Sequence, residues 1–205
     1  MLIHSDILLS LPYKGSRNYL HGTDFFNVLL EHAADITGHP NAFIQHLTFR
    51  RYARRPCVVK LTKPDDLDQI VSQVRFLTLP EKHKLNAWII ETSGVISERR
   101  PFNESLLLKK AQYNPTNNST VLLERTQFSS IEEIVVLTKY LNNIISPQVY
   151  EKWLFAQLDL SGPINNEYHT LEIKIKNLIA NKFSLNEIII DNKLAGTIRF
   201  IVGTP

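Results

Sequence analysis

The first long apolar segment of the chain spans 25–36 and predicts a helix, because its apolar residues recur every three or four positions. Additional apolar side chains widen this stripe beyond the face of an ordinary surface helix, so we expect other elements to cover it. Thr23 or Asp24 is expected to cap its start with a side-chain oxygen, and Gly38 and Pro40 are expected to end it.

Segments rich in aromatic and β-branched residues follow this helix and are expected to be strands. Their ranges are 43–52, 57–62, 70–78 and 85–98. Pro56 has no backbone N–H to donate to a strand ladder, so a break is expected between the first two ranges.

The second half of the chain repeats this order. An apolar helix is predicted at 131–145, and Ser130 and Glu133 have the spacing of a capping box at its start. Strands are expected at 153–160, 168–179, 185–190 and 194–202, with a hairpin turn at 191–193. The repeated order predicts an α+β protein made of two similar halves.

The asparagine-rich segment between the halves is expected to be a linker. This interpretation divides the chain into a first half at 1–102, a linker at 103–128 and a second half at 129–205. An apolar helix followed by antiparallel strands is buried best when the sheet curls around it. Each half is therefore expected to be an antiparallel sheet wrapped around a central helix.

Composition excludes several classes of protein. The 205 residues are 43% hydrophobic and 21% charged, which is typical of a globular chain rather than a disordered one. A net charge of +3 gives no sign of nucleic-acid binding, and no apolar run is long enough to predict a membrane span. The segment Met1–Asp6 lacks the features of a secretory signal, so a cytoplasmic protein is expected.

Metal and cofactor sites are not expected. Cys57 is the only cysteine, which precludes an intrachain disulfide and a cysteine-based zinc site, and its place in an apolar run predicts a buried thiol. His32, His39 and His46 fall on a helix, a loop and a strand, so they are not expected to converge on a metal. The sequence contains no glycine-rich phosphate loop and no nucleophile elbow.

Short motifs accompany the repeated order of elements. Leu20-His21-Gly22-Thr23 precedes the first apolar helix, 43–59 contains the run Phe-Arg-Arg-Tyr-Ala-Arg-Arg-Pro, and 88–95 begins with Trp and contains Gly94. These motifs resemble the helix start and the neighbouring strands of dehydratases of fatty-acid and polyketide synthesis. The pattern as a whole resembles the hot-dog fold, and the tandem resembles a double hot dog.

The resemblance implies a ligand and a place for it. The ligand is an acyl thioester on an acyl carrier protein or on coenzyme A, expected in a tunnel between the two halves. The backbone N–H of Gly22 would bind the thioester carbonyl, because the start of a helix presents unpaired donors and a partial positive charge. Glycine at this position lets the backbone approach the ligand closely.

The resemblance also implies an acid–base pair, from which this chain departs. The family carries a histidine before that glycine, in a stretch that reads Pro-Tyr-Lys-Gly here. His21 is the candidate base in its place, and Glu132 or Glu133 is the candidate carboxylate from the second half. A packing role for His21 and a capping role for Glu133 are the alternative interpretations.

Thr23, Tyr13 and Arg17 lie close to His21 and Gly22 in the sequence and are candidate substrate-binding residues. A basic cluster of Arg50, Arg51, Arg54 and Arg55 follows in the first half. One interpretation of this cluster is a charged strand edge that blocks pairing with another chain. The other is a docking surface for an acidic carrier protein, because guanidinium groups bind carboxylates and phosphates in pairs of hydrogen bonds.

Two functions stay open on the sequence. One is a dehydratase-like or thioesterase-like enzyme that acts on acyl thioesters. The other is a catalytically degenerate double hot dog that binds an acyl chain or a protein. A less favoured interpretation is an α+β protein of another family, and a monomer or a homodimer is expected in every case.

Overall fold

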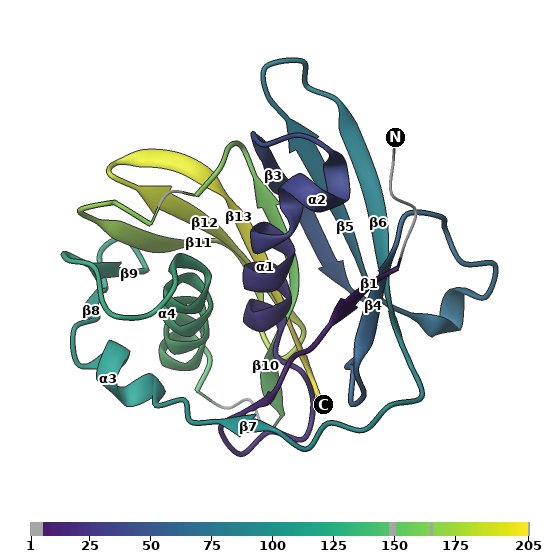
Figure 1. The fold of residues 1–205 in the computed structure, drawn as a ribbon. Coiled ribbons are helices and arrows are strands. Elements are labelled where there is room, and N and C mark those ends of the chain that lie inside the picture. The colour runs from purple at the N-terminus through teal and green to yellow at the C-terminus, as the bar shows by residue number, and fades with distance from the viewer. Residues whose placement is uncertain (1–5, 148–150, 165, 205) are drawn as a thin grey trace. The chain divides into compact units, whose positions relative to one another are not determined.

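The computed structural model describes residues 6–147, 151–164 and 166–204 (Figure 1). The prediction for Met1–Asp6 concerns a segment of which positions 1–5 lie outside the described residues. The chain divides into two compact units, Met1–Phe102 and Asn103–Pro205. Both contain helices and antiparallel strands, in agreement with the α+β class predicted from the sequence.

The first unit has one main sheet and two consecutive helices. The helices are α1 (Gly22–Glu31) and α2 (Ala33–Thr37). The sheet has the order β1-β4-β6-β5-β3, with β1 (Ile7–Leu9), β3 (Ala42–Phe49), β4 (Cys57–Lys60), β5 (Ile70–Thr78) and β6 (Lys84–Glu91). A 3-10 helix, η1 (Leu67–Gln69), precedes β5, and β2 (Tyr13–Lys14) pairs in parallel with β7 (Arg99–Arg100).

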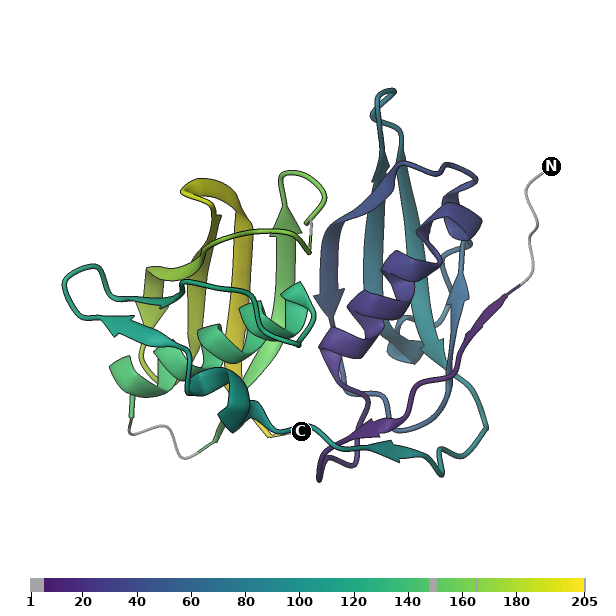
Figure 2. The ribbon, with the colours of Figure 1, turned by 60° about the vertical axis from the view of Figure 1, so that its left-hand side comes forward.

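Helix α1 packs its apolar side against the sheet of the first unit (Figure 2). Phe25, Phe26 and Leu29 are buried there, and the ring of Phe25 lies 6.0 Å from that of Phe49 on β3. The wide apolar stripe of the sequence thus correctly predicts a covered helix, because these rings have no favourable place in water.

Two details of this helix differ from the sequence prediction. The predicted single helix ends at Glu31 and restarts after His32, whose φ of −93° and ψ of 7° break the helical path. His21, rather than Thr23 or Asp24, is the cap residue. The side chains of Thr23 and Asp24 are buried against Lys14 instead, which removes them from a capping role. Gly38 ends α2 in the left-handed conformation, as predicted.

The strand break at Pro56 is confirmed, but the pairing differs from a simple meander. Strand β4 pairs with β6, and β5 lies between β6 and β3. The segment 61–69, which includes η1, connects β4 on one side of β6 to β5 on its other side. The predicted strand 85–98 ends at Glu91, because the chain beyond it turns along Pro56, where the N–H of Thr92 donates to the Pro56 carbonyl at 2.8 Å.

The second unit has two helices and a meander. Its helices are α3 (Glu104–Leu108) and α4 (Ser130–Ile145). Its sheet has the order β10-β13-β12-β11-β9-β8, with β8 (Gln112–Asn114), β9 (Ser119–Leu122), β10 (Lys152–Leu160), β11 (Leu171–Ile179), β12 (Phe183–Ile190) and β13 (Lys193–Gly203). The predicted turn between β12 and β13 is present, with Asp191 and Asn192 at φ values of 47° and 63°.

Residues 103–128, expected as a linker, contain α3, β8 and β9 of this second unit. Asn114 accepts hydrogen bonds from the N–H groups of Thr116 and Asn117, and Asn118 has a φ of 47°. The asparagines therefore form a hairpin turn, which asparagine favours because its side chain bonds to its own backbone.

Two findings concern the Cys57 thiol and the length and apolar character of the helices. Cys57 is fully buried, and burial raises the pKa of its thiol to about 12. Among the described residues, no helix combines the length and apolar character needed to cross a membrane.

Candidate active site

The start of α1 combines a partly exposed Gly22 with a buried polar cluster. The N–H groups of Asp24 and Phe25 donate to the carbonyl of His21, so the helix begins at Gly22. The N–H groups at the very start of a helix have no acceptor within the helix, and they carry a partial positive charge. Gly22 is partly exposed, which leaves this end of the helix accessible to a ligand.

Lys14 lies at the centre of the polar cluster with a fully buried side chain. Its Nζ donates to Thr23 Oγ1 at 2.8 Å and to Asp24 Oδ1 at 2.9 Å, and it lies 4.2 Å from the centre of the Phe102 ring. Arg100 also donates to Asp24 Oδ1. The carboxylate and the ring compensate the cost of burying the ammonium group.

His21 joins this cluster through Thr23. Its Nδ1 lies 2.7 Å from Thr23 Oγ1, and its ring lies 6.4 Å from that of Phe102. The guanidinium of Arg17 is 5.9 Å from the same ring. The structure therefore brings together His21, Gly22, Thr23 and Arg17, four of the residues singled out in the sequence.

Tyr13 is directed elsewhere. Its hydroxyl donates to the backbone carbonyl of Arg54 at 2.6 Å, and the guanidinium of Arg99 lies 5.3 Å from its ring. Tyr13 thus connects β2 to the arginine-rich loop rather than to His21.

The arginines of that loop have different surroundings. Arg51 forms an ion pair with Glu91 at 2.6 Å, whereas the side chains of Arg50, Arg54 and Arg55 are exposed. Burial alone would raise the pKa of Glu91. Hydrogen bonds from Arg51 and from the N–H groups of Arg54 and Arg55 outweigh burial and lower it. Glu91 therefore fixes the backbone of the loop that carries the exposed Arg54 and Arg55.

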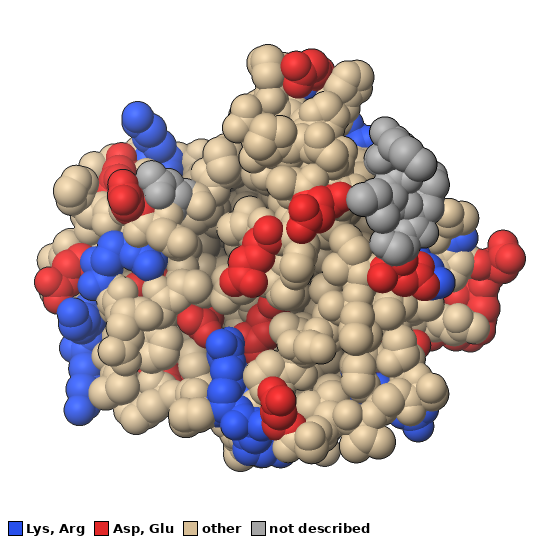
Figure 3. Space-filling view, in the orientation of Figure 1, with Lys and Arg blue, Asp and Glu red and all other residues tan. Residues whose placement is uncertain are grey.

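Charge on the face drawn in Figure 3 is mixed. Figure 3 shows lysine and arginine side chains interspersed with acidic ones on one face, so neither sign forms a continuous surface there. This agrees with the small net charge of +3.

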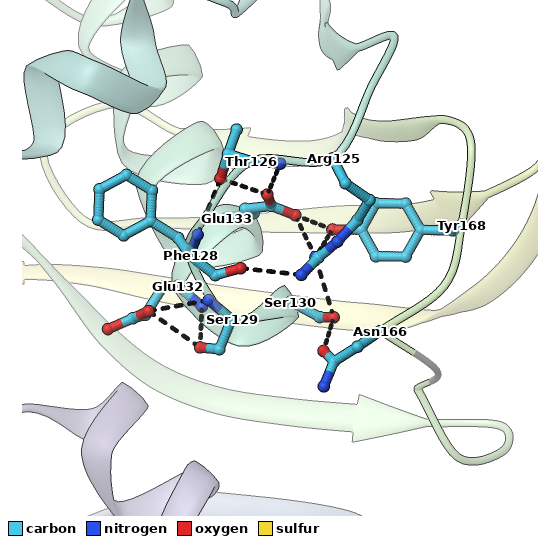
Figure 4. A network of polar contacts seen from close by, with 9 residues as sticks. All are labelled: Arg125, Thr126, Phe128, Ser129, Ser130, Glu132, Glu133, Asn166 and Tyr168. Atoms are coloured by element: carbon cyan, nitrogen blue, oxygen red, sulfur yellow. Dashed lines mark hydrogen bonds and ion pairs between the residues drawn. The ribbon is translucent and has the colours of Figure 1, made fainter.

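The capping box of α4 lies one residue earlier than predicted. Ser129, not Ser130, is the cap, and Glu132 Oε2 accepts from the Ser129 N–H at 2.9 Å (Figure 4). The reason is that Glu133 is fully buried in another network. The second carboxylate oxygen of Glu132 is directed away from Ser129 in Figure 4.

Glu133 accepts hydrogen bonds at both carboxylate oxygens. Arg125 donates to Oε2 at 2.6 Å, and Tyr168 also donates to Oε2. The N–H of Thr126 donates to Oε1 at 2.8 Å. Burial and the contact with Glu133 raise the pKa of the Tyr168 hydroxyl, so Tyr168 is a donor at every physiological pH.

Arg125 connects this carboxylate to the rest of the helix start. It donates to the carbonyl of Phe128 at 2.9 Å and to Ser130 Oγ at 3.2 Å, and its guanidinium lies 4.7 Å from the Tyr168 ring centre. Ser130 in turn donates to Asn166 at 2.5 Å. The two units therefore share a feature: the first turn of each long helix holds a buried carboxylate paired with a cation that stacks on an aromatic ring.

Sequence reasoning did not identify the cations of these clusters. Arg100 is 76 positions from Asp24, whereas Lys14 and Arg125 precede their carboxylates by 10 and 8 positions. Lysine or arginine in a polar segment is normally solvated, so its type alone does not predict burial. The one available signal is that each cluster has a cation ahead of an acidic first helical turn. Among the described residues, no group of histidine, cysteine, aspartate and glutamate side chains is arranged to hold a metal ion.

Comparison with known proteins adds to this geometry. The dehydratase domain of PpsC from Mycobacterium tuberculosis, in complex with C12:1-CoA, superposes with a TM-score of 0.53 at 10% identity, covering 99% of this chain and 90% of that chain. A protein from Novosphingobium aromaticivorans described as a thioesterase superposes with a TM-score of 0.50 at 12% identity, covering 98% and 94%. The chain has a hot-dog fold.

The hot-dog fold expected from the sequence is thus confirmed, and the chain resembles acyl-thioester dehydratases in structure. No family model matches the sequence, and no curated protein matches it either. At 10–12% identity the likeness to these two structures concerns the fold of the hot-dog protein and not its individual residues.

Proposed function

We propose that this hot-dog protein is an enzyme that acts on acyl thioesters, either by dehydrating a 3-hydroxyacyl group or by hydrolysing the thioester. The observation that carries this proposal is the match of 99% of the chain to a dehydratase domain in complex with C12:1-CoA. The second match, to a protein described as a thioesterase, supports the same class of substrate. Coenzyme A or an acyl carrier protein would carry the acyl group.

The proposal includes a tandem of two hot dogs, one in 1–102 and one in 129–205. In support, each unit has a long apolar helix followed by antiparallel strands, β3–β6 in the first and β10–β13 in the second. The strand orders differ, because β4 pairs with β6 in the first unit while β11, β12 and β13 are consecutive neighbours in the second.

The chemistry would begin at the start of α1. The N–H of Gly22 would donate to the thioester carbonyl oxygen, which gains negative charge when a proton leaves the α-carbon or a nucleophile adds. His21 is the adjacent titratable group, and Thr23 and Arg17 lie within its surroundings. This supports a role for His21 in contact with the ligand.

Of the two candidate carboxylates, Glu133 has the more clearly structural role. Both oxygens of Glu133 accept hydrogen bonds from Arg125, Thr126 or Tyr168, which supports a structural role for that residue. Glu132 uses Oε2 for the capping box, and its other oxygen is directed away from the cap (Figure 4).

Turnover tests the proposal. The protein is incubated with 3-hydroxyacyl-CoA and acyl-CoA, and enoyl product and free thiol are measured. His21→Ala is expected to lower kcat/KM at least about 100-fold, because a positioned acid or base contributes that much or more. Glu132→Gln is expected to lower it comparably while keeping the helix cap, since glutamine also accepts from Ser129.

His32→Ala is the matched control, because His32 lies at the other end of α1 and contacts Asp35 at 3.4 Å. This variant should keep wild-type turnover. Binding of the thioester without any product would contradict an enzyme and favour a catalytically degenerate hot-dog protein that binds the acyl group. Equal turnover in wild type and His21→Ala would remove His21 from the site.

The exposed arginines support a docking surface for an acidic carrier protein. Reversing Arg50, Arg54 and Arg55 to glutamate is expected to weaken binding of an acyl carrier protein at least about tenfold at low salt, because opposed charges then repel. Arg51 is left in place, since it holds Glu91. Binding is measured by calorimetry at two salt concentrations.

A charge-matched control reverses Lys109, Lys182 and Lys193, which are exposed in the second unit. This control has the same net charge as the arginine variant, so a selective loss assigns docking to the arginine cluster. Equal affinity of the two variants would contradict a specific docking surface.

A further inference from the structure

A chain of polar contacts leads from the buried Lys14 to His21. Thr23 Oγ1 lies between them, 2.8 Å from Lys14 Nζ and 2.7 Å from His21 Nδ1. Lys14 and Thr23 are both fully buried, so water does not compete for these contacts. The protonation and position of Lys14 therefore constrain which nitrogen of His21 carries the proton.

The number of donors and acceptors among Lys14, Thr23 and His21 fixes the positions of the protons. An ammonium group only donates, so Lys14 occupies one lone pair of the Thr23 hydroxyl. The hydroxyl has one proton of its own, and in the described part of the chain its hydrogen-bond partners are Lys14 and His21. Its proton therefore points to Nδ1 of His21, which must accept.

The opposite arrangement has a clear cost. If His21 carried its proton on Nδ1 while neutral, the Thr23 hydroxyl would receive two donors and its own buried proton would lose its acceptor. A buried donor without a partner costs about 1–3 kcal/mol, and 1.4 kcal/mol is a factor of ten in a population. The neutral ring is thus held with its proton on Nε2 by an added factor of roughly 5 to 150.

Lys14 itself is fixed in this arrangement. Its Nζ also donates to Asp24 Oδ1 at 2.9 Å, and the ammonium lies 4.2 Å from the Phe102 ring centre. These contacts prevent the side chain from turning away from Thr23.

We propose that Lys14 is a positioning residue for His21: through the Thr23 hydroxyl it holds the neutral imidazole in the Nε2–H form. Any group that meets Nε2, whether a carboxylate or a carbonyl, must then accept a hydrogen bond. Resting on the proposed function, this makes neutral His21 a donor to the thioester carbonyl oxygen. The α-proton would then be removed by a carboxylate and not by His21.

Nitrogen NMR of the imidazole rings tests the positioning role without substrate. Protein with ¹⁵N-labelled histidine is studied at a pH where His21 is neutral, and its signals are assigned by their loss in His21→Gln. Wild type should show a proton-bearing Nε2 and an unprotonated Nδ1, with a tautomer ratio at least about fivefold above that of free histidine. Thr23→Val and Lys14→Met should move the ratio to that of free histidine under the same conditions.

Two comparisons guard against a structural explanation. Thr23→Ser keeps the hydroxyl and should restore the wild-type ratio, and the signals of His32 should not change in any variant. If Lys14→Met does not fold, comparing the His21 tautomer ratio in Thr23→Val with that in Thr23→Ser still tests whether the hydroxyl holds the ring. A proton on Nδ1 in wild type, or an unchanged ratio in folded Thr23→Val, would overturn the inference. Absence of turnover would leave this result intact and would count against the proposed function alone.

Discussion

Replacing Arg125 with methionine should lower the free energy of unfolding by about 3–5 kcal/mol, because the change leaves a buried carboxylate without its cation. Glu133 is fully buried, and Arg125 is its 2.6 Å ion-pair partner. The same substitution removes the donors to Phe128 and Ser130 at the start of α4. Urea denaturation followed by circular dichroism measures the loss.

Two further variants identify the cause of this loss. Lys139→Met removes a partly exposed ion pair with Glu104 and should cost less than about 1 kcal/mol. Adding Glu133→Gln to Arg125→Met removes the unpaired charge and should recover part of the stability. If Arg125→Met costs no more than Lys139→Met, the network around Glu133 does not stabilise α4.

The Gly196→Ala variant should lose about 3 kcal/mol of stability, because its side chain would collide with backbone atoms that cannot move independently. Gly196 lies in β13 opposite Leu160 of β10. A Cβ at this position would lie 2.1 Å from the Asp159 carbonyl oxygen and 3.0 Å from the Leu160 Cα. The β10–β13 pairing would have to separate to admit it.

Gly162→Ala is the matched control for this prediction. A Cβ at Gly162 meets no heavy atom within 4 Å, so the same chemical change should leave the denaturation midpoint almost unaltered. Similar midpoints for the two variants would show that the close approach at Gly196 is not a constraint on the sheet.

Hydrophobic patterning predicts most of the secondary structure of this protein. The apolar stripes at 25–36 and 131–145 identify α1 and α4, and the break at Pro56 and the turn at 191–193 follow from local chemistry. These features depend on neighbours within a few positions, which is the range over which a sequence pattern acts.

The sequence pattern does not decide between Ser129 and Ser130 as the helix cap. Ser129 with Glu132 and Ser130 with Glu133 have identical capping-box spacing. Tyr168, which is 35 positions from Glu133, donates to that glutamate together with Arg125 and Thr126, and these contacts leave Glu132 to cap with Ser129. A local pattern contains no information about a partner so far along the chain.

The burial of Lys14 and the strand order also lie beyond a local pattern. Burial of Lys14 depends on Asp24, Thr23 and Phe102, and lysine is ordinarily taken as a surface residue. The pairing of β4 with β6 depends on the path of 61–69, which the apolar pattern does not specify. Thr23 and Arg17 lie near His21 in the structure because they are within a few positions of it in the sequence.

Conversion of acyl thioesters, the function proposed for this hot-dog protein, is tested most directly by mass spectrometry. A 3-hydroxyacyl-CoA and its saturated acyl-CoA counterpart are each analysed after incubation with the wild-type protein. We expect either an enoyl-CoA formed by loss of one water or a free acid together with coenzyme A. Recovery of both thioesters unchanged, at a protein concentration where binding is saturated, would contradict the claim.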